Sequence, residues 1–127
     1  MKKEVFVSPP GVYPPIGYTH AIKVGNTIYL SGKTGRDLQR KVVEGGFEAQ
    51  ATKAFENIKL TLEAAGASLQ DVVALTIYFK NIDDVAKFHE VTARFFKPPL
   101  PTMTGVEISR LAPGVAVEIQ AVAVVDS

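Results

Sequence analysis

Residues 47–80 read FEAQATKAFENIKLTLEAAGASLQDVVALTIYFK, and this stretch decides the fold. Its first part places apolar residues at the i, i+3, i+4, i+7 spacing of an amphipathic helix, at positions 47, 51, 54, 55, 58, 62 and 65. Gly66 stands where a glycine commonly closes a helix. Residues 72–80 are apolar on both alternations, which is typical of a strand covered on both faces. The stretch therefore predicts a helix over 47–65 and a central strand over 72–80.

The segment before this helix predicts strands and two loops. Residues 20–24 and 27–31 alternate with a period of two around Gly25-Asn26, which predicts a hairpin, and residues 4–7 predict a short first strand. The segment 8–17 is proline-rich, which excludes a helix or a central strand. Residues 32–46 are polar and predict a loop. Its cations, Lys33, Arg36, Arg40 and Lys41, are expected to be solvated or, alternatively, to contact a ligand.

The segment after residue 80 predicts a second helix and two more strands. The helix is expected over 83–96, with Asn81 or Asp83 as its cap and prolines after its end. Strands are expected over 104–109 and 116–125. The element order β-ββ-α-β-α-ββ predicts an α+β protein in which two helices cover a sheet, and residues 1–127 form a single domain.

Composition excludes several classes of function. The chain has 127 residues and no cysteine, which rules out a disulfide framework, a thiol nucleophile and cysteine-ligated metal sites. Two histidines leave little for a metal site, and we expect no metal or cofactor. The formal net charge of +1 argues against a nucleic-acid partner. No apolar run is long enough to span a membrane, and no signal peptide is recognised, so we expect a cytoplasmic protein without a membrane partner.

Glu118 is the most informative polar residue, because it interrupts the otherwise apolar last strand, residues 115–125, which contains only one further polar residue, Gln120. A carboxylate in such a strand is costly to bury unless it is paired, hydrogen-bonded or neutral. The period of two places Glu118 on the same face as Val122 and Val124. Glu118 therefore belongs either to a structural ion pair or to a functional site, and the sequence leaves both open.

Four other residues have simpler interpretations. Glu107 is expected to point outward into solvent, and His89 is expected to be partly exposed on the second helix. His20 begins a strand, so we expect it to be solvated or bound to a loop. Tyr18 is expected to pack against the proline-rich segment. No GxSxG elbow, phosphate-binding loop or metal-ligand spacing accompanies them.

Three motifs, in order and covering nearly the whole chain, resemble those of the Rid family, also known as the YjgF/YER057c/UK114 family. VGNTIYLSG at 24–32 resembles its first hairpin, and AAGASLQDVV at 64–73 resembles its helix-to-strand junction. PTMTGVEISRL at 101–111, followed by VEI at 117–119, resembles its closing motif. The resemblance implies a fold like that of Bacillus-type chorismate mutase, a six-stranded mixed sheet with two helices on one face. It also implies a homotrimer with a barrel core and small-molecule ligands in intersubunit clefts.

The resemblance further implies hydrolysis of 2-imino acids or enamines to 2-keto acids and ammonia, without a cofactor. The family glutamate that positions the attacking water corresponds to Glu118, as the catalytic residue. The substrate-binding positions correspond to Tyr18, Ser31 and Gly32, and to three departures from the family pattern, His89, Met103 and Gly105. Met103 replaces the arginine that clamps the substrate carboxylate, which places the chain in an arginine-lacking branch.

Methionine cannot form the bidentate hydrogen bonds of that arginine, and loss of a charged partner costs about 1.5–3 kcal/mol, which argues against the standard 2-imino acid deaminase activity. Three hypotheses follow. The first is a hydrolase or deaminase of the family, with water positioned by Glu118 and with another means of binding the substrate. The second is a non-catalytic trimeric metabolite-binding protein. The third and weaker one, an endoribonuclease or translation inhibitor as some members are named, conflicts with the near-neutral charge.

Overall fold

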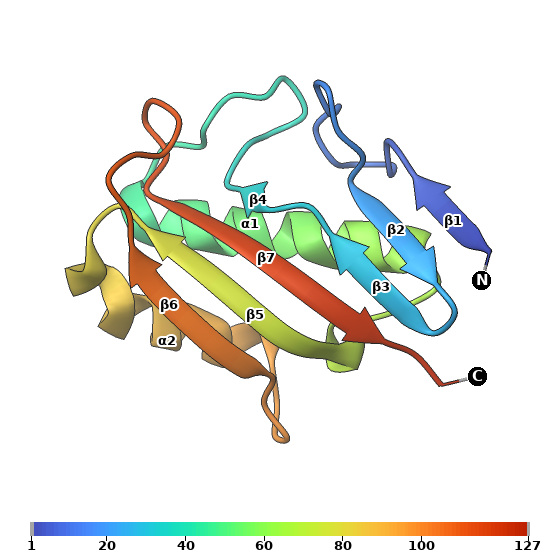
Figure 1. The fold of residues 1–127 in the computed structure, drawn as a ribbon. Coiled ribbons are helices and arrows are strands. Elements are labelled where there is room, and N and C mark those ends of the chain that lie inside the picture. Colours follow the sequence, from blue (N-terminus) through green and yellow to red (C-terminus); the bar gives the residue numbers. More distant parts are fainter. Residues whose placement is uncertain (1, 127) are drawn as a thin grey trace.

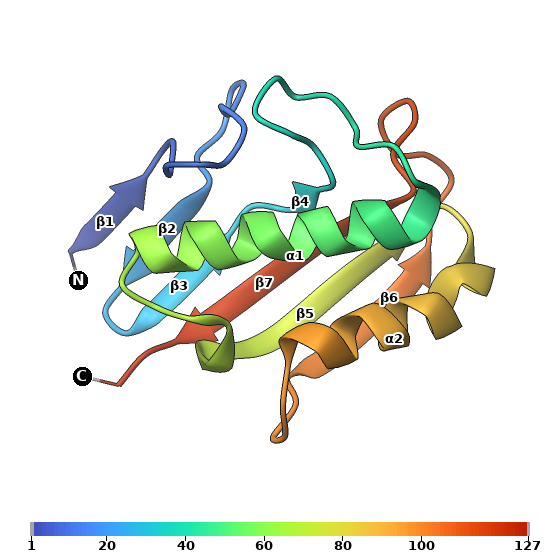
Figure 2. The ribbon, with the colours of Figure 1, turned by 180° about the vertical axis from the view of Figure 1, so that it is seen from behind.

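The computed structural model describes residues 2–126 as a layer of sheet with two helices on one face (Figures 1 and 2). Met1 and Ser127, the ends of the predicted single domain, lie outside the described residues. The strands and helices are β1 (Lys3–Phe6), β2 (Ala21–Val24), β3 (Thr27–Leu30), β4 (Lys33–Thr34), α1 (Gly46–Ala64), β5 (Val72–Phe79), α2 (Val85–Phe95), β6 (Thr102–Glu107) and β7 (Val117–Val124). Short 3-10 turns, η1 (Leu69–Asp71) and η2 (Ile82–Asp84), precede β5 and α2.

The sheet is mixed, as the resemblance implied. Its strand order is β1-β2-β3-β7-β5-β6, and only the β5–β6 pair is parallel among the described strands. Both helices lie behind the sheet in Figure 1 and in front of it in Figure 2. This arrangement confirms the predicted fold class. One strand was missed: β4, in the predicted loop 32–46, pairs with β7 at the positions that β3 leaves unpaired.

The core lies between α1 and the central strands. Ala51, Phe55 and Ile58 of α1 are fully buried, as their helical spacing predicted. Full burial of such a large apolar side chain contributes about 1.5–3 kcal/mol. Gly66 follows the helix with a φ of 81°, a left-handed conformation that favours glycine. The sequence therefore predicted both the buried face of α1 and the place where it ends.

The second helix begins later than predicted, because η2 occupies its expected first turn. Asn81 caps that turn by accepting a hydrogen bond from the Asp83 amide at 2.9 Å. Phe88 and Val91 are buried against the core. Val85, at the start of α2, is 38% exposed and lies at the edge of the packed surface.

The sheet face away from the helices carries apolar and polar residues and is only partly covered within the described residues. Leu75, Ile77 and Phe79 of β5 are buried beneath the helices, while the alternate positions of β5 are partly exposed. Tyr29 and Val124, whose neighbours Ile28 and Ala123 face the helices, are 54% and 43% exposed. The expected cover on both faces of β5 is therefore not supplied by this chain alone. Within residues 2–126, neither helix has the length and apolar character needed to cross a membrane.

Candidate functional site

A polar pocket of about 250 Å³ opens where the chain passes from β3 to β4 beside β7. It brings together four of the predicted site residues, and its full lining is Tyr13, Tyr18, Ser31, Gly32, Thr34, Arg36, Arg40 and Glu118. Ser31 and Gly32 form the two-residue break between β3 and β4, and both strands pair with β7. The break therefore leaves room beside β7 for a side chain and a small ligand.

Glu118 lies half-buried in this pocket, on the sheet face away from the helices. It stands opposite Thr34 on β4 and Tyr78 on β5. A Cβ atom at Gly32 would overlap Glu118 Oε2, so a glycine is needed where the carboxylate lies against the main chain. Among residues 2–126 Glu118 forms no salt bridge, which removes the ion-pair interpretation within the described chain.

Ser31 and Tyr18 form one wall of the pocket. The Ser31 hydroxyl donates a hydrogen bond to the Thr19 carbonyl, so its oxygen keeps lone pairs for a ligand donor. The Ser31 amide donates to the His20 carbonyl at 3.0 Å, which fixes the main chain at the end of β3. Tyr18 is 37% exposed, and its ring packs edge-on against His20 with centroids 5.2 Å apart. Its position in the pocket was implied by the resemblance.

His20 is fully buried and bonded to the proline-rich loop, so of the two predicted alternatives the loop-bound one is confirmed and the solvated one is wrong. Its Nε2 lies 2.8 Å from the Tyr13 carbonyl and donates to it, which binds the proline-rich segment to the sheet. Its Nδ1 has no hydrogen-bond partner among the described residues. Burial, with the nearby Lys33 charge, lowers the pKa of His20 below its ordinary value of 6.5. His20 is therefore a neutral structural residue behind the pocket.

Lys33 is also fully buried, so the expectation of a solvated basic loop is wrong at this position. It lies on β4 opposite Ile119, and pairing with β7 draws it into the interior. Its Nζ donates to the carbonyls of His20 and Ser31 at 3.1 and 2.9 Å. Burial lowers the pKa of Lys33 from 10.5 to about 7, against the opposing attraction of Glu118. Lys33, with its lowered pKa, therefore holds the main chain at Ser31 in place through these hydrogen bonds.

Sequence reasoning did not place Tyr13 in the site. It is buried, and its hydroxyl accepts a hydrogen bond from the Thr34 amide at 3.1 Å. Burial raises the pKa of the Tyr13 hydroxyl, so it remains protonated at neutral pH. Tyr13 lies in a proline-rich segment without periodicity, which gave no signal for its position.

Arg36 and Arg40 had been recognised only as part of a basic loop, and both line the pocket. The Arg36 Nη1 donates to Thr34 Oγ1 at 2.8 Å. The Arg40 guanidinium lies over the ring of Tyr13, 5.2 Å from its centroid, and donates to the Pro14 carbonyl. The ligand-contact alternative for these two cations is therefore compatible with where the structure places them.

The remaining predicted site residues, His89, Met103 and Gly105, lie elsewhere in the chain. His89 and Met103 line an apolar hollow of about 650 Å³ between the end of α2 and the segment before β6. All three line a smaller hollow of about 210 Å³ on the helix side of the sheet. Glu118 faces the opposite side of the sheet. A single chain thus separates the predicted site residues into two groups.

The details of this second group refine the sequence-based expectations. His89 is exposed, as predicted, with its ring 6.1 Å from that of Phe88. Met103 packs against the hydrophobic core. A Cβ atom at Gly105 would lie 3.0 Å from the Phe79 ring, so the ring occupies the space that a larger residue would need. The glycine at position 105 therefore has a packing explanation.

Glu107 is exposed, as predicted, and lies outside both groups. Its Oε1 accepts a hydrogen bond from the Ile82 amide at 3.0 Å, which satisfies the main chain at the start of η2. This is a structural role that the sequence did not reveal.

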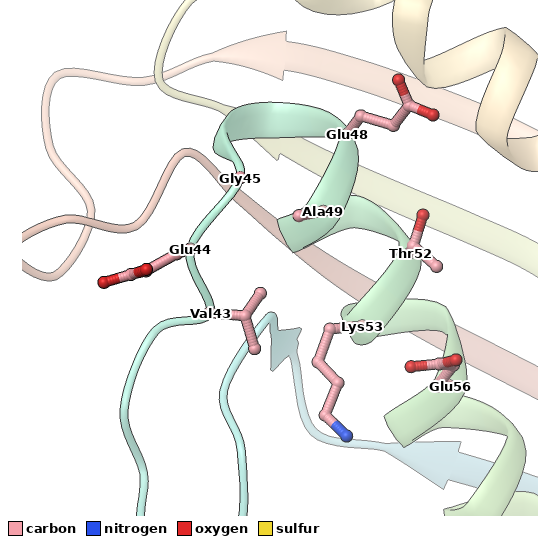
Figure 3. A pocket seen from close by; sticks show the side chains of 8 residues that line it. All are labelled: Val43, Glu44, Gly45, Glu48, Ala49, Thr52, Lys53 and Glu56. Carbon is pink, nitrogen blue, oxygen red and sulfur yellow. The ribbon is translucent and has the colours of Figure 1, made fainter.

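A third hollow, of about 460 Å³, lies beside the start of α1 and contains none of the predicted site residues (Figure 3). Its acidic side chains are directed away from a common centre, and Glu48 points toward α2. There Glu48 pairs with Arg94 at 2.8 Å and Lys87 at 3.5 Å. The hollow thus offers no cluster for chemistry, and no group of three potential metal ligands occurs among residues 2–126.

The fold and the pocket define a class: a small α+β chain with a half-buried glutamate beside a glycine in a polar pocket. The family model described as Endoribonuclease L-PSP matches residues 12–125, and the chain belongs to this family, which is the Rid family that the motifs resembled. A RutC family protein of Pyrococcus abyssi is 41% identical over 97% of this chain and 98% of its own length.

Two further comparisons agree with this assignment. A protein of Dermatophagoides farinae named 2-iminobutanoate/2-iminopropanoate deaminase is 35% identical, over 99% of this chain and all of its own length. The crystal structure of RidA from the Antarctic bacterium Psychrobacter superposes with a TM-score of 0.90 at 36% identity, covering 96% of this chain and 99% of the other. These proteins show what the chain is similar to in sequence and fold.

Proposed function

We propose that this chain is the subunit of a homotrimeric hydrolase of the arginine-lacking branch, which releases ammonia from a small imine or enamine without a metal or cofactor. The observation that carries the proposal is the Glu118 carboxylate. It is half-buried, lies against Gly32, forms no salt bridge among residues 2–126 and faces a pocket with Tyr18 and Ser31. A relative named as a deaminase supports the same reaction class.

Glu118 acts as the base toward water. Its carboxylate accepts a proton from water as the water oxygen bonds to the carbon of the C=N group, and solvent protonates the nitrogen. Glu118 then gives its proton to the amine nitrogen of the carbinolamine, the hydroxyl proton passes to solvent, and the C–N bond breaks with ammonia as leaving group as the carbonyl forms. One water is consumed, one ammonia is released and the Glu118 carboxylate is regenerated. General base catalysis of this kind contributes about 10²–10⁴-fold.

Ser31 is suited to the nitrogen end of the substrate. Its hydroxyl proton is directed to the Thr19 carbonyl, so the oxygen is available as an acceptor for an imine N–H. Because its proton is already directed to the Thr19 carbonyl, the Ser31 hydroxyl does not serve as a donor to a negatively charged substrate oxygen. Tyr18 keeps its hydroxyl free to donate to the carbinolamine oxygen, because no hydrogen bond of that hydroxyl occurs among the described residues.

The second group of predicted residues joins the site through assembly. We propose that His89, Met103 and Gly105 of one subunit face the pocket of its neighbour, which completes an intersubunit cleft. The exposed apolar residues on the sheet face away from the helices, Tyr29 and Val124 among them, supply surface that a trimer would bury. Analytical ultracentrifugation is expected to give a trimer, and a monomer at micromolar concentration contradicts this part of the proposal.

The catalytic proposal is tested by ammonia release from freshly generated 2-iminobutanoate and 2-aminoacrylate. We expect the wild-type protein to accelerate release well above hydrolysis in buffer, and Glu118→Gln to lose about 10²-fold or more of that acceleration. Glu63→Gln is the matched control, because Glu63 is an exposed carboxylate on α1, on the helix side of the sheet and outside the pocket. A wild-type rate equal to that of buffer, or an unaffected Glu118→Gln variant, refutes the proposal.

A second function is favoured by the apolar hollow at Met103. This hollow of about 650 Å³ is lined by apolar groups that include Phe96 and Leu100, and Leu100 is 57% exposed. Such a lining is typical of small-molecule binding sites. A non-catalytic trimeric metabolite-binding protein would show saturable binding of its ligand with no ammonia release from either imine.

A further inference from the structure

Arg36 and Arg40 are two cations that line the Glu118 pocket without an acidic partner. All ion pairs found among residues 2–126 join Lys87 and Arg94 to Glu48 or Glu90 on the helices, and neither pocket arginine takes part. A guanidinium carries five N–H donors. Arg36 directs one to Thr34 and Arg40 directs one to Pro14, so each keeps donors for a ligand.

Both side chains are held in place by the fold. Arg40 has a φ of 63°, the left-handed conformation that non-glycine residues rarely adopt. In that conformation its guanidinium lies over the Tyr13 ring and reaches the proline-rich segment, and both views show the loop after β4 rising beside the loop between β1 and β2 (Figures 1 and 2). Arg36 is fixed by the Thr34 hydroxyl, and Thr34 stands opposite Glu118. The two guanidinium groups are thus pre-organised at the pocket that contains Glu118.

We propose that Arg36 and Arg40 bind the carboxylate of the substrate, and so supply from the loop after β4 the anion recognition that Met103 cannot provide. The inference rests on the proposed function for the reacting end of the substrate, which would lie at Glu118.

Charge and size define the substrate class. With Glu118 ionised, the two arginines leave the pocket lining with one net positive charge, which one carboxylate neutralises. The pocket volume of about 250 Å³ is small, which suits a compound of a few carbon atoms. The structure therefore points to a short-chain monocarboxylate whose carbonyl or imine carbon reaches Glu118. Paired guanidinium donors bind such a group more strongly than neutral hydrogen bonds do.

The test compares the binding of 2-oxobutanoate with that of its methyl ester, which has the same ketone and no charge, by calorimetry on the full chain. We expect the wild-type protein to prefer the acid by about tenfold or more, because hydrogen bonds to charged groups are lost with the ester. Arg36→Gln and Arg40→Gln are each expected to weaken acid binding about tenfold without changing ester binding. Lys41→Gln is the matched control, because Lys41 is an exposed cation of the same loop outside the pocket.

Several results overturn the inference. They are an equal affinity of the wild-type protein for acid and ester, no binding of either, unchanged acid binding in the Arg36→Gln and Arg40→Gln double variant, or an equal loss in Lys41→Gln. Arg40→Lys, which keeps the charge, serves if the glutamine variants do not fold. It is expected to retain part of the preference for the acid. The comparison of acid binding with ester binding by the wild-type protein tests the inference without any variant.

The inference and the proposed function fail separately. Arginine-dependent binding of the acid without ammonia release would refute the proposed reaction and leave the carboxylate site standing. Ammonia release that depends on Glu118, with acid binding unaffected by the arginine variants, would refute the carboxylate site and leave the proposed reaction standing.

Discussion

Replacing the buried Lys33 by methionine is expected to flatten the dependence of stability on pH between pH 7 and 9. Burial lowers the pKa of Lys33 from 10.5 to about 7 in the folded chain. Between these two values the unfolded chain holds a proton that the folded chain has released. Stability therefore rises with pH in this window, and below pH 7 the full penalty of protonating a buried amine is present.

The magnitude follows from the pKa difference. Each unit corresponds to about 1.4 kcal/mol, so the wild-type protein should gain about 2 kcal/mol of unfolding free energy from pH 7 to 9 relative to Lys33→Met. His20, with a lowered pKa, titrates below this window, and Tyr13, with a raised pKa, titrates above it. The difference between the two proteins therefore isolates Lys33.

The assay is urea unfolding at pH 7, 8 and 9 at one fixed protein concentration, with the exposed Lys41→Met as control. Lys41→Met should follow the wild-type profile. Parallel profiles of the wild-type protein and Lys33→Met would refute the reasoning. If Lys33→Met does not fold, the pH titration of the ¹³Cε resonances of the wild-type lysines replaces the unfolding assay. One lysine should titrate near pH 7. Titration of all lysines near pH 10 would contradict the reasoning for Lys33.

Three further predictions test the fold and the pocket. Gln50→Ala removes two hydrogen bonds from α1 to the segment before β7, including one from the Ala116 amide at 2.8 Å, and should lower the unfolding free energy by about 1–3 kcal/mol in urea titrations. The lowered pKa of His20 means that stability falls as pH falls below 6.5, and His20→Asn should reduce this slope in acid unfolding. Gly32→Ala should displace the Glu118 carboxylate and slow ammonia release by up to about a hundredfold while the chain remains folded by circular dichroism.

Local periodicity explains why most of the fold was predictable. The helix expected over 47–65 is α1 at Gly46–Ala64, and the strand expected over 72–80 is β5 at Val72–Phe79. The strand β4 has two residues, too few for a period, and exists only because β7 offers it a pairing edge. Burial of Lys33 followed from that pairing, so the sequence pattern predicted a solvated cation instead.

The candidate site was predictable in part. Alternation in the last strand placed Glu118 on the same face as Val122 and Val124, and the burial pattern of β7 shows that this is the less buried face of the strand. The family motifs added Tyr18, Ser31 and Gly32, which the structure brings to the same pocket. Whether the second group, with Met103, reaches the pocket of a neighbouring subunit stays a prediction.

The sequence by itself determined the helices, the main strands, the family and the position of one glutamate in an apolar strand, because each depends on residues close together in the chain. Only the tertiary structure decided what surrounds that glutamate. Tyr13, Arg36 and Arg40 come from segments without periodicity, and they meet Glu118 because β4 pairs with β7 and the proline-rich segment is held by His20. Contacts between distant segments depend on packing and hydrogen bonding of the whole fold, which no local pattern records.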